Sequence, residues 1–144
     1  MSDSFKFQVN VTFDQGLSKK FDDAAQQAFK ETAAELTGRF TDAIKGAYWP
    51  WPFPASNGKG SPRSIVDTGA LAGSMDYNIT NTTAKWKWTV SYAAAVHEGA
   101  RLWNGAVLPP RPWTTAVLEG GTSASVPVYP FTDEMKARIV KLLN

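Results

Sequence analysis

Hydrophobic and polar residues alternate near the start of the chain. The hydrophobic positions are Phe5, Phe7, Val9, Val11 and Phe13, and the polar positions between them are Lys6, Gln8, Asn10 and Thr12. Because successive side chains of a β-strand point to opposite faces, this alternation predicts a strand with one buried and one solvated face. Residues 14–16 predict the turn that follows, since Gly16 tolerates backbone angles that other residues resist.

After this turn the spacing of the hydrophobic residues changes to three and four positions. These residues are Leu17, Phe21, Ala24, Ala25, Ala28, Phe29, Leu36, Phe40 and Ile44. The spacing predicts one amphipathic helix from about Lys19 to Gly46, preceded by Ser18 as its N-cap. At about 1.5 Å per residue the helix would be on the order of 40 Å long. We therefore expect its ends to extend beyond the sheet that it covers.

A second alternating stretch predicts a β-hairpin in the middle of the chain. Its apolar positions are Met75, Tyr77 and Ile79 on the outgoing strand and Trp86, Trp88, Val90 and Tyr92 on the return strand. Lys85, Lys87, Thr89 and Ser91 occupy the alternate positions of the return strand, and residues 81–83 form the predicted turn. One face is therefore expected to be packed and the other solvated. Since tryptophans and lysines lie on opposite faces, the tryptophans are interpreted as core residues and not as a platform for nucleic-acid bases.

Three short helices are predicted around the hairpin, each ending at a glycine. They cover residues 67–72, 93–98 and 113–119, and the glycines are Gly73, Gly99 and Gly120. Asp67 or Thr68 would cap the first of them. Residues 100–107 are expected to form a loop.

The C-terminal part of the chain predicts an extended segment and then a helix. Residues 126–129 are expected to be extended, and Pro127 restricts them to an edge position. The helix is predicted to begin with Thr132 as its cap and to contain a favourable pair of Glu134 with Arg138. Its expected buried stripe consists of Phe131, Met135, Ile139 and Leu142.

A long loop with an unusual composition is predicted at about residues 48–64. Its first part, Tyr48-Trp-Pro-Trp-Pro-Phe-Pro54, alternates aromatic residues with proline and is therefore extended and semi-rigid. Exposed aromatics are favoured anchors of protein interfaces; alternatively, the segment packs on its own domain as a cover. The expected interface residues are Trp49, Trp51, Phe53, Lys59, Arg63, Arg101, Trp103 and Arg111.

The bulk composition fits one domain that contains all of these elements. A chain of 144 residues with 43% hydrophobic residues can bury a core of its own. We expect residues 1–144 to form one α+β domain, in which an antiparallel sheet with a central hairpin is covered by the long N-terminal helix. The absence of cysteine excludes disulfides and thiolate metal sites. Neither a run of about 18 apolar residues nor a signal-peptide profile is found, so no membrane association is expected.

The distribution of charge leaves two interpretations open. The formal net charge of +2 is too small to indicate nucleic-acid binding by itself. The basic excess lies in residues 59–111, at Lys59, Arg63, Lys85, Lys87, Arg101 and Arg111. This segment is either an ordinary solvated surface or the phosphate-binding patch of a nucleic-acid-binding accessory protein.

Two short motifs resemble parts of catalytic sites, and each lacks a partner. His97-Glu98 would need a second histidine four residues after the first to bind zinc as in a metalloprotease, and the chain has Arg101 there. Asp67-Thr-Gly69 would need a second carboxylate to share a proton as in an aspartic protease. A hydrolase that uses Asp67 or His97 is a third alternative. We expect no catalytic residue, no cofactor and no metal.

Three segments with a fixed order bracket the hairpin. They are Asp67-Thr-Gly-Ala-Leu71, Tyr92-Ala-Ala-Ala-Val-His-Glu-Gly99 and Pro110-Arg-Pro-Trp113. Together with the long helix before them and the helical C-terminus, they resemble the tail-completion or neck (head–tail joining) protein family of long-tailed double-stranded DNA bacteriophages. The resemblance covers about residues 17–120.

The resemblance implies a structural virion protein without catalysis. Such proteins assemble as homo-oligomeric rings, here with about six or twelve subunits, which join the connector or adaptor of the head to the tail tube or tail terminator. Genomic DNA is expected to pass through the ring without sequence-specific binding. The expected location is the neck or tail of the virion, after assembly in the host cytoplasm.

Overall fold

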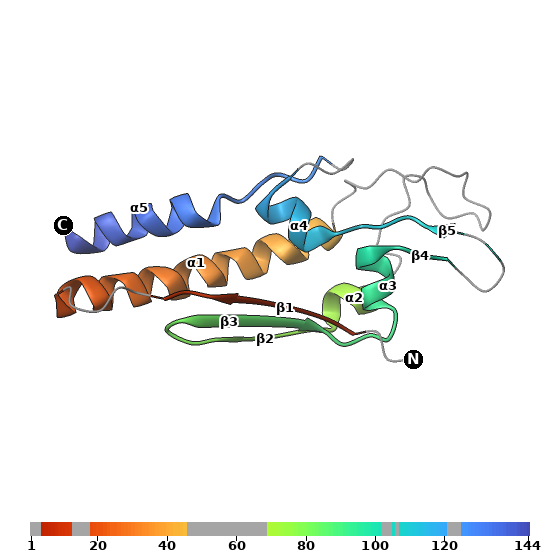
Figure 1. The fold of residues 1–144 in the computed structure, drawn as a ribbon, viewed down its shortest axis with the longest axis horizontal. Helices are drawn as coiled ribbons and strands as arrows, with labels where there is room; N and C mark the ends of the chain where they lie inside the picture. Colours follow the sequence, from red (N-terminus) through yellow and green to blue (C-terminus); the bar gives the residue numbers. More distant parts are fainter. Residues whose placement is uncertain (1–3, 13–17, 46–68, 102–104, 106, 121–124) are drawn as a thin grey trace.

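The chain forms three layers (Figure 1). The computed structural model describes residues 4–12, 18–45, 69–101, 105, 107–120 and 125–144. Helix α1 (Lys19–Lys45) lies between a β-sheet on one side and the C-terminal helix α5 (Phe131–Leu143) on the other. This arrangement confirms the expected α+β class, with an antiparallel sheet covered by the long N-terminal helix.

The sheet consists of β1 (Phe5–Asn10), β2 (Met75–Ile79) and β3 (Thr83–Trp88), in the spatial order β1-β3-β2. β3 runs antiparallel to both neighbours, and the register aligns the residues in rows across the three strands. One row contains Phe7, Trp86 and Tyr77, and the next contains Lys6, Lys87 and Asp76. Because side chains alternate between faces along a strand, all apolar rows share the face that α1 covers.

Aromatic side chains from the sheet and from α1 form the centre of the core. Phe40 of α1 lies edge-on to Trp86 and Trp88, with ring centroids 5.2 and 5.7 Å apart. All three side chains are at most 1% exposed, so the prediction that the tryptophans are core residues is confirmed. Trp86 donates a hydrogen bond from Nε1 to Thr37 Oγ1 (2.8 Å), which satisfies its polar atom inside the core.

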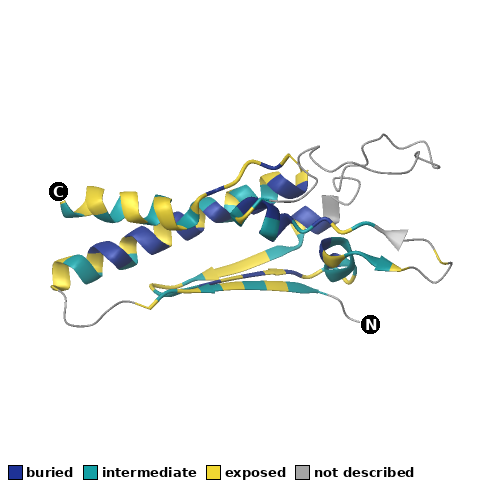
Figure 2. Cartoon of the chain, turned by 45° about the horizontal axis from the view of Figure 1, so that its top comes forward, coloured by how far each residue is buried: buried dark blue, intermediate teal, exposed yellow. Residues whose placement is uncertain are grey.

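Helix α1 begins where the sequence predicts. Ser18 Oγ accepts a hydrogen bond from the backbone N–H of Phe21 (3.1 Å), as an N-cap does. The helix runs to Lys45, and the predicted end at Gly46 lies outside the described residues. Its buried side forms a continuous stripe (Figure 2), which includes one polar residue, Thr32.

The hairpin is present, but its turn is placed differently and its return strand is shorter than predicted. Thr83 is the first residue of β3, and its N–H and C=O groups bond to Thr80, so the turn comprises residues 80–82. β3 ends at Trp88. Val90 and Tyr92, which were expected on the strand, follow it and pack half-buried against the core.

Three short helices gather near the C-terminal end of α1 (Figure 1). They are α2 (Gly69–Gly73), α3 (Ala93–Glu98) and α4 (Trp113–Leu118). The bounds of α3 are as predicted, and Gly99 after it has a φ of 81°, a conformation that favours glycine. The predicted caps of α2, Asp67 and Thr68, lie outside the described residues.

The prediction of a loop at residues 100–107 is wrong at both ends. β4 (Ala100–Arg101) pairs antiparallel with β5 (Val107–Leu108). Gly105, which lies between these strands, has a φ of 83°, a conformation that favours glycine.

Two predictions for the C-terminal part are corrected. Residues 126–129 belong to no strand, so their expected edge position in a sheet is wrong. Tyr129 instead donates its N–H to Val117 O of α4 (2.7 Å), and its side chain is buried. α5 begins at Phe131 and not after a Thr132 cap, because the N–H of Glu134 already bonds to Pro130 O (2.9 Å).

The predicted buried stripe of α5 is only half-buried. No residue of α5 is fully buried, and Leu142 is 41% exposed. The physical reason is visible in Figure 1, where α5 lies along α1 and reaches the sheet nowhere. A helix with one neighbour on one side has too little cover to bury a full stripe.

Candidate functional site

Of the interface residues expected from the sequence, Arg101 and Arg111 lie in the described part of the chain. Arg101 is exposed on β4. Arg111 is 6% exposed, and its N–H donates to Val96 O of α3 (2.9 Å), so its own fold covers most of it. The remaining six positions lie outside the described residues: Trp49, Trp51, Phe53, Lys59, Arg63 and Trp103.

His97, the single histidine of the chain, is buried in α3. Its ring stacks on Phe5 of β1 and lies edge-on to Trp113 of α4, at centroid distances of 3.9 and 4.6 Å. Nδ1 donates to Glu98 Oε1 (2.5 Å), because a carboxylate can only accept, and Nε2 accepts from Thr114 Oγ1 (2.7 Å). The neutral imidazole thus satisfies both ring nitrogens and connects α3 with β1 and α4.

The electrostatics of His97 agree with this packing position. Burial lowers the pKa of the imidazole below its usual value of 6.5, although Glu98 acts in the opposite direction. Among the described residues, no group of three or more His, Asp or Glu side chains is placed to hold a metal ion. Asp67, the other residue considered for chemistry, lies outside the described residues.

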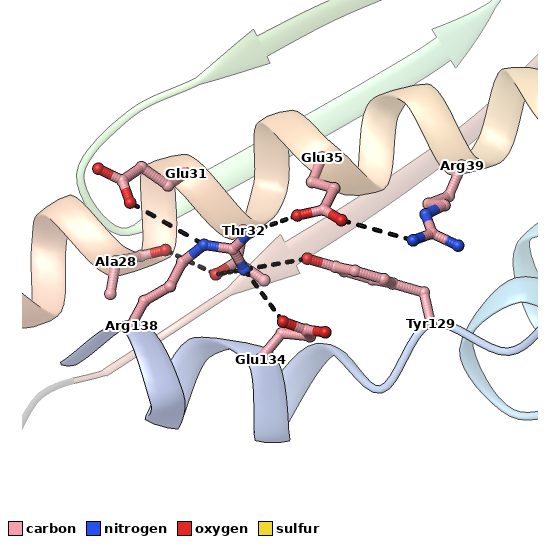
Figure 3. A network of polar contacts seen from close by, with 8 residues as sticks. All are labelled: Ala28, Glu31, Thr32, Glu35, Arg39, Tyr129, Glu134 and Arg138. Atoms are coloured by element: carbon pink, nitrogen blue, oxygen red, sulfur yellow. Dashed lines mark hydrogen bonds and ion pairs between the residues drawn. The ribbon is translucent and has the colours of Figure 1, made fainter. Parts of the chain in front are cut away.

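A polar network centred on Arg138 joins α5 to α1 (Figure 3). Arg138 donates to the hydroxyls of Tyr129 (3.1 Å) and Thr32 (3.2 Å). It also forms an ion pair with Glu35 of α1 and lies 3.6 Å from Glu134 of its own helix. These charge-assisted bonds hold α5 on α1, together with half-buried apolar residues such as Phe131 and Met135.

The carboxylates of this network are engaged with cations. Hydrogen bonding to Arg138 is the largest cause that lowers the pKa of the Glu35 carboxyl. Arg39 forms a second ion pair with Glu35 (3.5 Å) and lies over the ring of Tyr129, 5.2 Å from its centroid. Because each acidic group faces a guanidinium, the network is built to hold two helices together.

The sheet face opposite α1 is polar, and we call it the open face. Its members are Lys6, Gln8, Asn10, Asp76, Asn78, Thr83, Lys85 and Lys87. The three lysines and Asp76 are exposed. Within the described part of the chain, none of these four forms an ion pair or a side-chain hydrogen bond. The open face therefore carries unneutralised positive charge at closely spaced positions.

This face has a depression over β1 and β3. Its volume is about 430 Å³, and its lining includes Lys6, Gln8, Lys85 and Lys87. Ammonium groups and an amide along a shallow depression can contact an extended anion, such as a phosphodiester backbone or an acidic protein surface. The aromatic rings of the sheet lie in the core, so they are not available there for base stacking.

Sequence reasoning missed two of these arrangements. Helical spacing pairs Arg138 with Glu134, but the contacts of Arg138 with Thr32 and Glu35 bridge 106 and 103 residues and leave no local signal. Lys6 was not grouped with Lys85 and Lys87, because only the strand register brings Lys6 opposite Lys87. The alternation of polar and hydrophobic residues on β1 places Lys6 on a solvated face, and this was the available signal for its grouping with Lys85 and Lys87.

No protein-family model, curated protein or solved structure matches the chain. Within the described residues, no helix has both the length and the apolar character needed to cross a membrane. The function is therefore argued from the geometry above and from the three sequence segments that bracket the hairpin.

Proposed function

We propose that the chain is a ring-forming structural subunit of a bacteriophage neck or tail-completion complex, without catalytic activity. As such a subunit it would connect the head connector to the tail. The observation that carries the proposal is the arrangement of the three segments that resemble this family.

The described parts of these segments are structural elements around one hairpin. Gly69–Leu71 open α2 directly before β2, residues 92–99 contain α3 after β3, and Trp113 opens α4. Leu71, Ala93 and Trp113 are fully buried, each at 0% exposure. Their order and burial agree with segments that specify a fold, which is the role that the resemblance implies.

The oligomeric state of the purified protein tests this proposal. We expect rings in negatively stained electron micrographs and a molar mass of several subunits by light scattering. In virions that carry a tagged copy, a gold-labelled antibody is expected at the junction of head and tail. A monodisperse monomer, together with label absent from that junction, would contradict the proposal.

A second function is supported by the open face. The open face carries three exposed lysines against one acid, Asp76, which favours a nucleic-acid-binding accessory protein that contacts phosphates independently of sequence. This alternative requires no ring. It predicts DNA affinity that falls steeply with salt, and absence of DNA binding at low salt would remove it.

A further inference from the structure

Both outer strands of the sheet have a free edge. The spatial order β1-β3-β2 leaves one side of β1 and one side of β2 without a neighbour, and no described residue donates to or accepts from the backbone there. Free edges of this kind pair readily with other chains. β2 contains neither proline nor lysine, two of the residues that usually protect an edge.

Tyr77 is an exposed aromatic residue on the outer strand β2. It lies in the same row and on the same face as Trp86, which is 1% exposed, yet Tyr77 itself is 56% exposed. A further strand that continued the sheet past β2 would cover this side chain.

We propose that the free edge of β2 pairs with the free edge of β1 in a second copy of this chain, so that the sheet continues from copy to copy. The inference rests on the proposed ring and names the surface through which it closes. β1 and β2 are parallel to each other, because both are antiparallel to β3. A contact between β2 and the next copy's β1 is therefore a parallel pair.

The side chains of the two edges are complementary when the rows are continued in register. Met75, Tyr77 and Ile79 would lie beside Phe5, Phe7 and Val9 of the next copy, with apolar groups against apolar groups. On the open face, Asp76 would lie beside the next copy's Lys6, and Asn78 beside its Gln8. Within the described residues of one copy, Lys6 has only Lys87 beside it on this face, whereas Asp76 has Lys87 opposite it. The contact would give Lys6 an acidic neighbour and would place Asp76 between two lysines.

The same complementarity argues against a two-fold dimer. A contact of β2 with β2, or of β1 with β1, would use one edge of each copy and leave the other edge free. It would also leave Asp76 and Lys6 without each other. The β2–β1 contact uses both edges of every copy, and repetition of such a heterologous contact closes a ring when its rotation allows.

Engineered cysteines test the contact directly. The double variant with Lys6→Cys and Asp76→Cys carries one thiol on each edge, and in-register strands would place the Cα atoms of the two cysteines in neighbouring copies about 5 Å apart, within the range that a disulfide spans. Within one copy the two positions are two strand spacings apart, about 10 Å, which prevents an internal disulfide. The chain has no cysteine of its own, so every cross-link comes from the introduced pair.

After mild oxidation with oxidised glutathione, we expect a ladder of linked multimers on a non-reducing gel, whose highest band gives the number of copies in the ring. Each single-cysteine variant should remain at the mass of one chain. A register control combines Asp76→Cys with Asn10→Cys, which moves the second thiol by about 13 Å along β1 and should abolish the ladder.

The failures of the two proposals are distinguishable. Rings without a ladder, or cross-links in a single-cysteine variant, would overturn the edge contact and leave the ring itself intact. A wild-type protein that stays monomeric would overturn both.

A second measurement uses Tyr77→Asp, which we expect to raise the dissociation constant of assembly at least tenfold, whereas Tyr77→Phe should assemble as the wild type does. Normal assembly of Tyr77→Asp would also overturn the contact.

Discussion

Single buried polar side chains form hydrogen bonds between neighbouring elements of the fold. His97 and Thr114 satisfy each other between α3 and α4, and Trp86 is bonded to Thr37 of α1. In the described part of the chain, Trp88 Nε1 and Trp113 Nε1 are buried without a hydrogen-bond partner. Because an unpaired buried N–H destabilises the fold, the satisfied contacts of His97 and Trp86 are the ones whose removal is expected to matter.

His97 makes the stability of the protein depend on pH. Burial lowers the pKa of His97 in the folded state below 6.5, whereas the unfolded chain has the ordinary value. As pH falls through about 6.5, the unfolded state therefore binds a proton that the folded state does not, and stability decreases. We expect the thermal midpoint to be lower at pH 5.5 than at pH 7.5, as measured by circular dichroism.

The variant His97→Gln separates this effect from other titrations. At pH 7.5 it should lose about 1–2 kcal/mol of stability through weakened hydrogen bonds. Its midpoint should, however, change little between pH 7.5 and 5.5, because the chain has no other histidine. The lowered pKa of Glu35 acts only below about pH 4.5, outside this window. An unchanged pH dependence in the variant would contradict the assignment.

Among the elements, α5 is attached to α1 through a polar network and through half-buried apolar residues. It has no fully buried residue, and Val140 and Leu142 are 59% and 41% exposed. Arg138 contacts Glu35 and Thr32 of α1, so it is the main anchor of this helix. Loss of the Arg138 contacts is therefore expected to loosen α5 before the remaining layers unfold.

Substitution of Arg138 tests this anchor. Arg138→Met removes the bonds to Tyr129, Thr32 and Glu35 and leaves the carboxylates facing each other, so we expect a loss of about 2–3 kcal/mol. In the Arg138→Met variant, the backbone amides of α5 should exchange with solvent faster than those of the sheet. The matched control Lys136→Met lies on the exposed side of the same helix and should change stability by less than about 0.5 kcal/mol. Equal effects of both variants would contradict the anchor.

Elements whose pattern is set by local spacing were predictable from the sequence. The alternation of Phe5, Phe7 and Val9 and the N-cap at Ser18 each determine structure within a few residues. The burial of α5 was not predictable, because it depends on which neighbour covers the helix. In the same way, Arg138 reaches partners 103 and 106 residues away, and the position of Lys6 opposite Lys87 follows from strand register alone.

At the scale of the whole molecule, the two faces of the sheet differ: one is packed and the other is charged. α1 covers one face, and the open face carries Lys6, Lys85 and Lys87 with Asp76 as its one acid. If copies continue the sheet, six of them supply about 18 strands, a number at which closed barrels enclose a water-filled channel. With α1 on the outside, the lysines would line that channel, where passing DNA presents its phosphates.

The lysines of the open face are therefore expected to contact duplex DNA without regard to sequence. On a duplex, each phosphate contact contributes about −0.9 to the slope of log affinity against log salt. The double variant of Lys85→Gln with Lys87→Gln should make this slope shallower by about 2, as measured by fluorescence anisotropy between 50 and 200 mM salt. Lys30→Gln with Lys136→Gln removes the same charge from exposed positions on the two helices and should leave the slope nearly unchanged. Equal changes in both double variants would show that net charge, and not the open face, sets DNA affinity. If the wild type does not bind DNA at 50 mM salt, the nucleic-acid function is excluded.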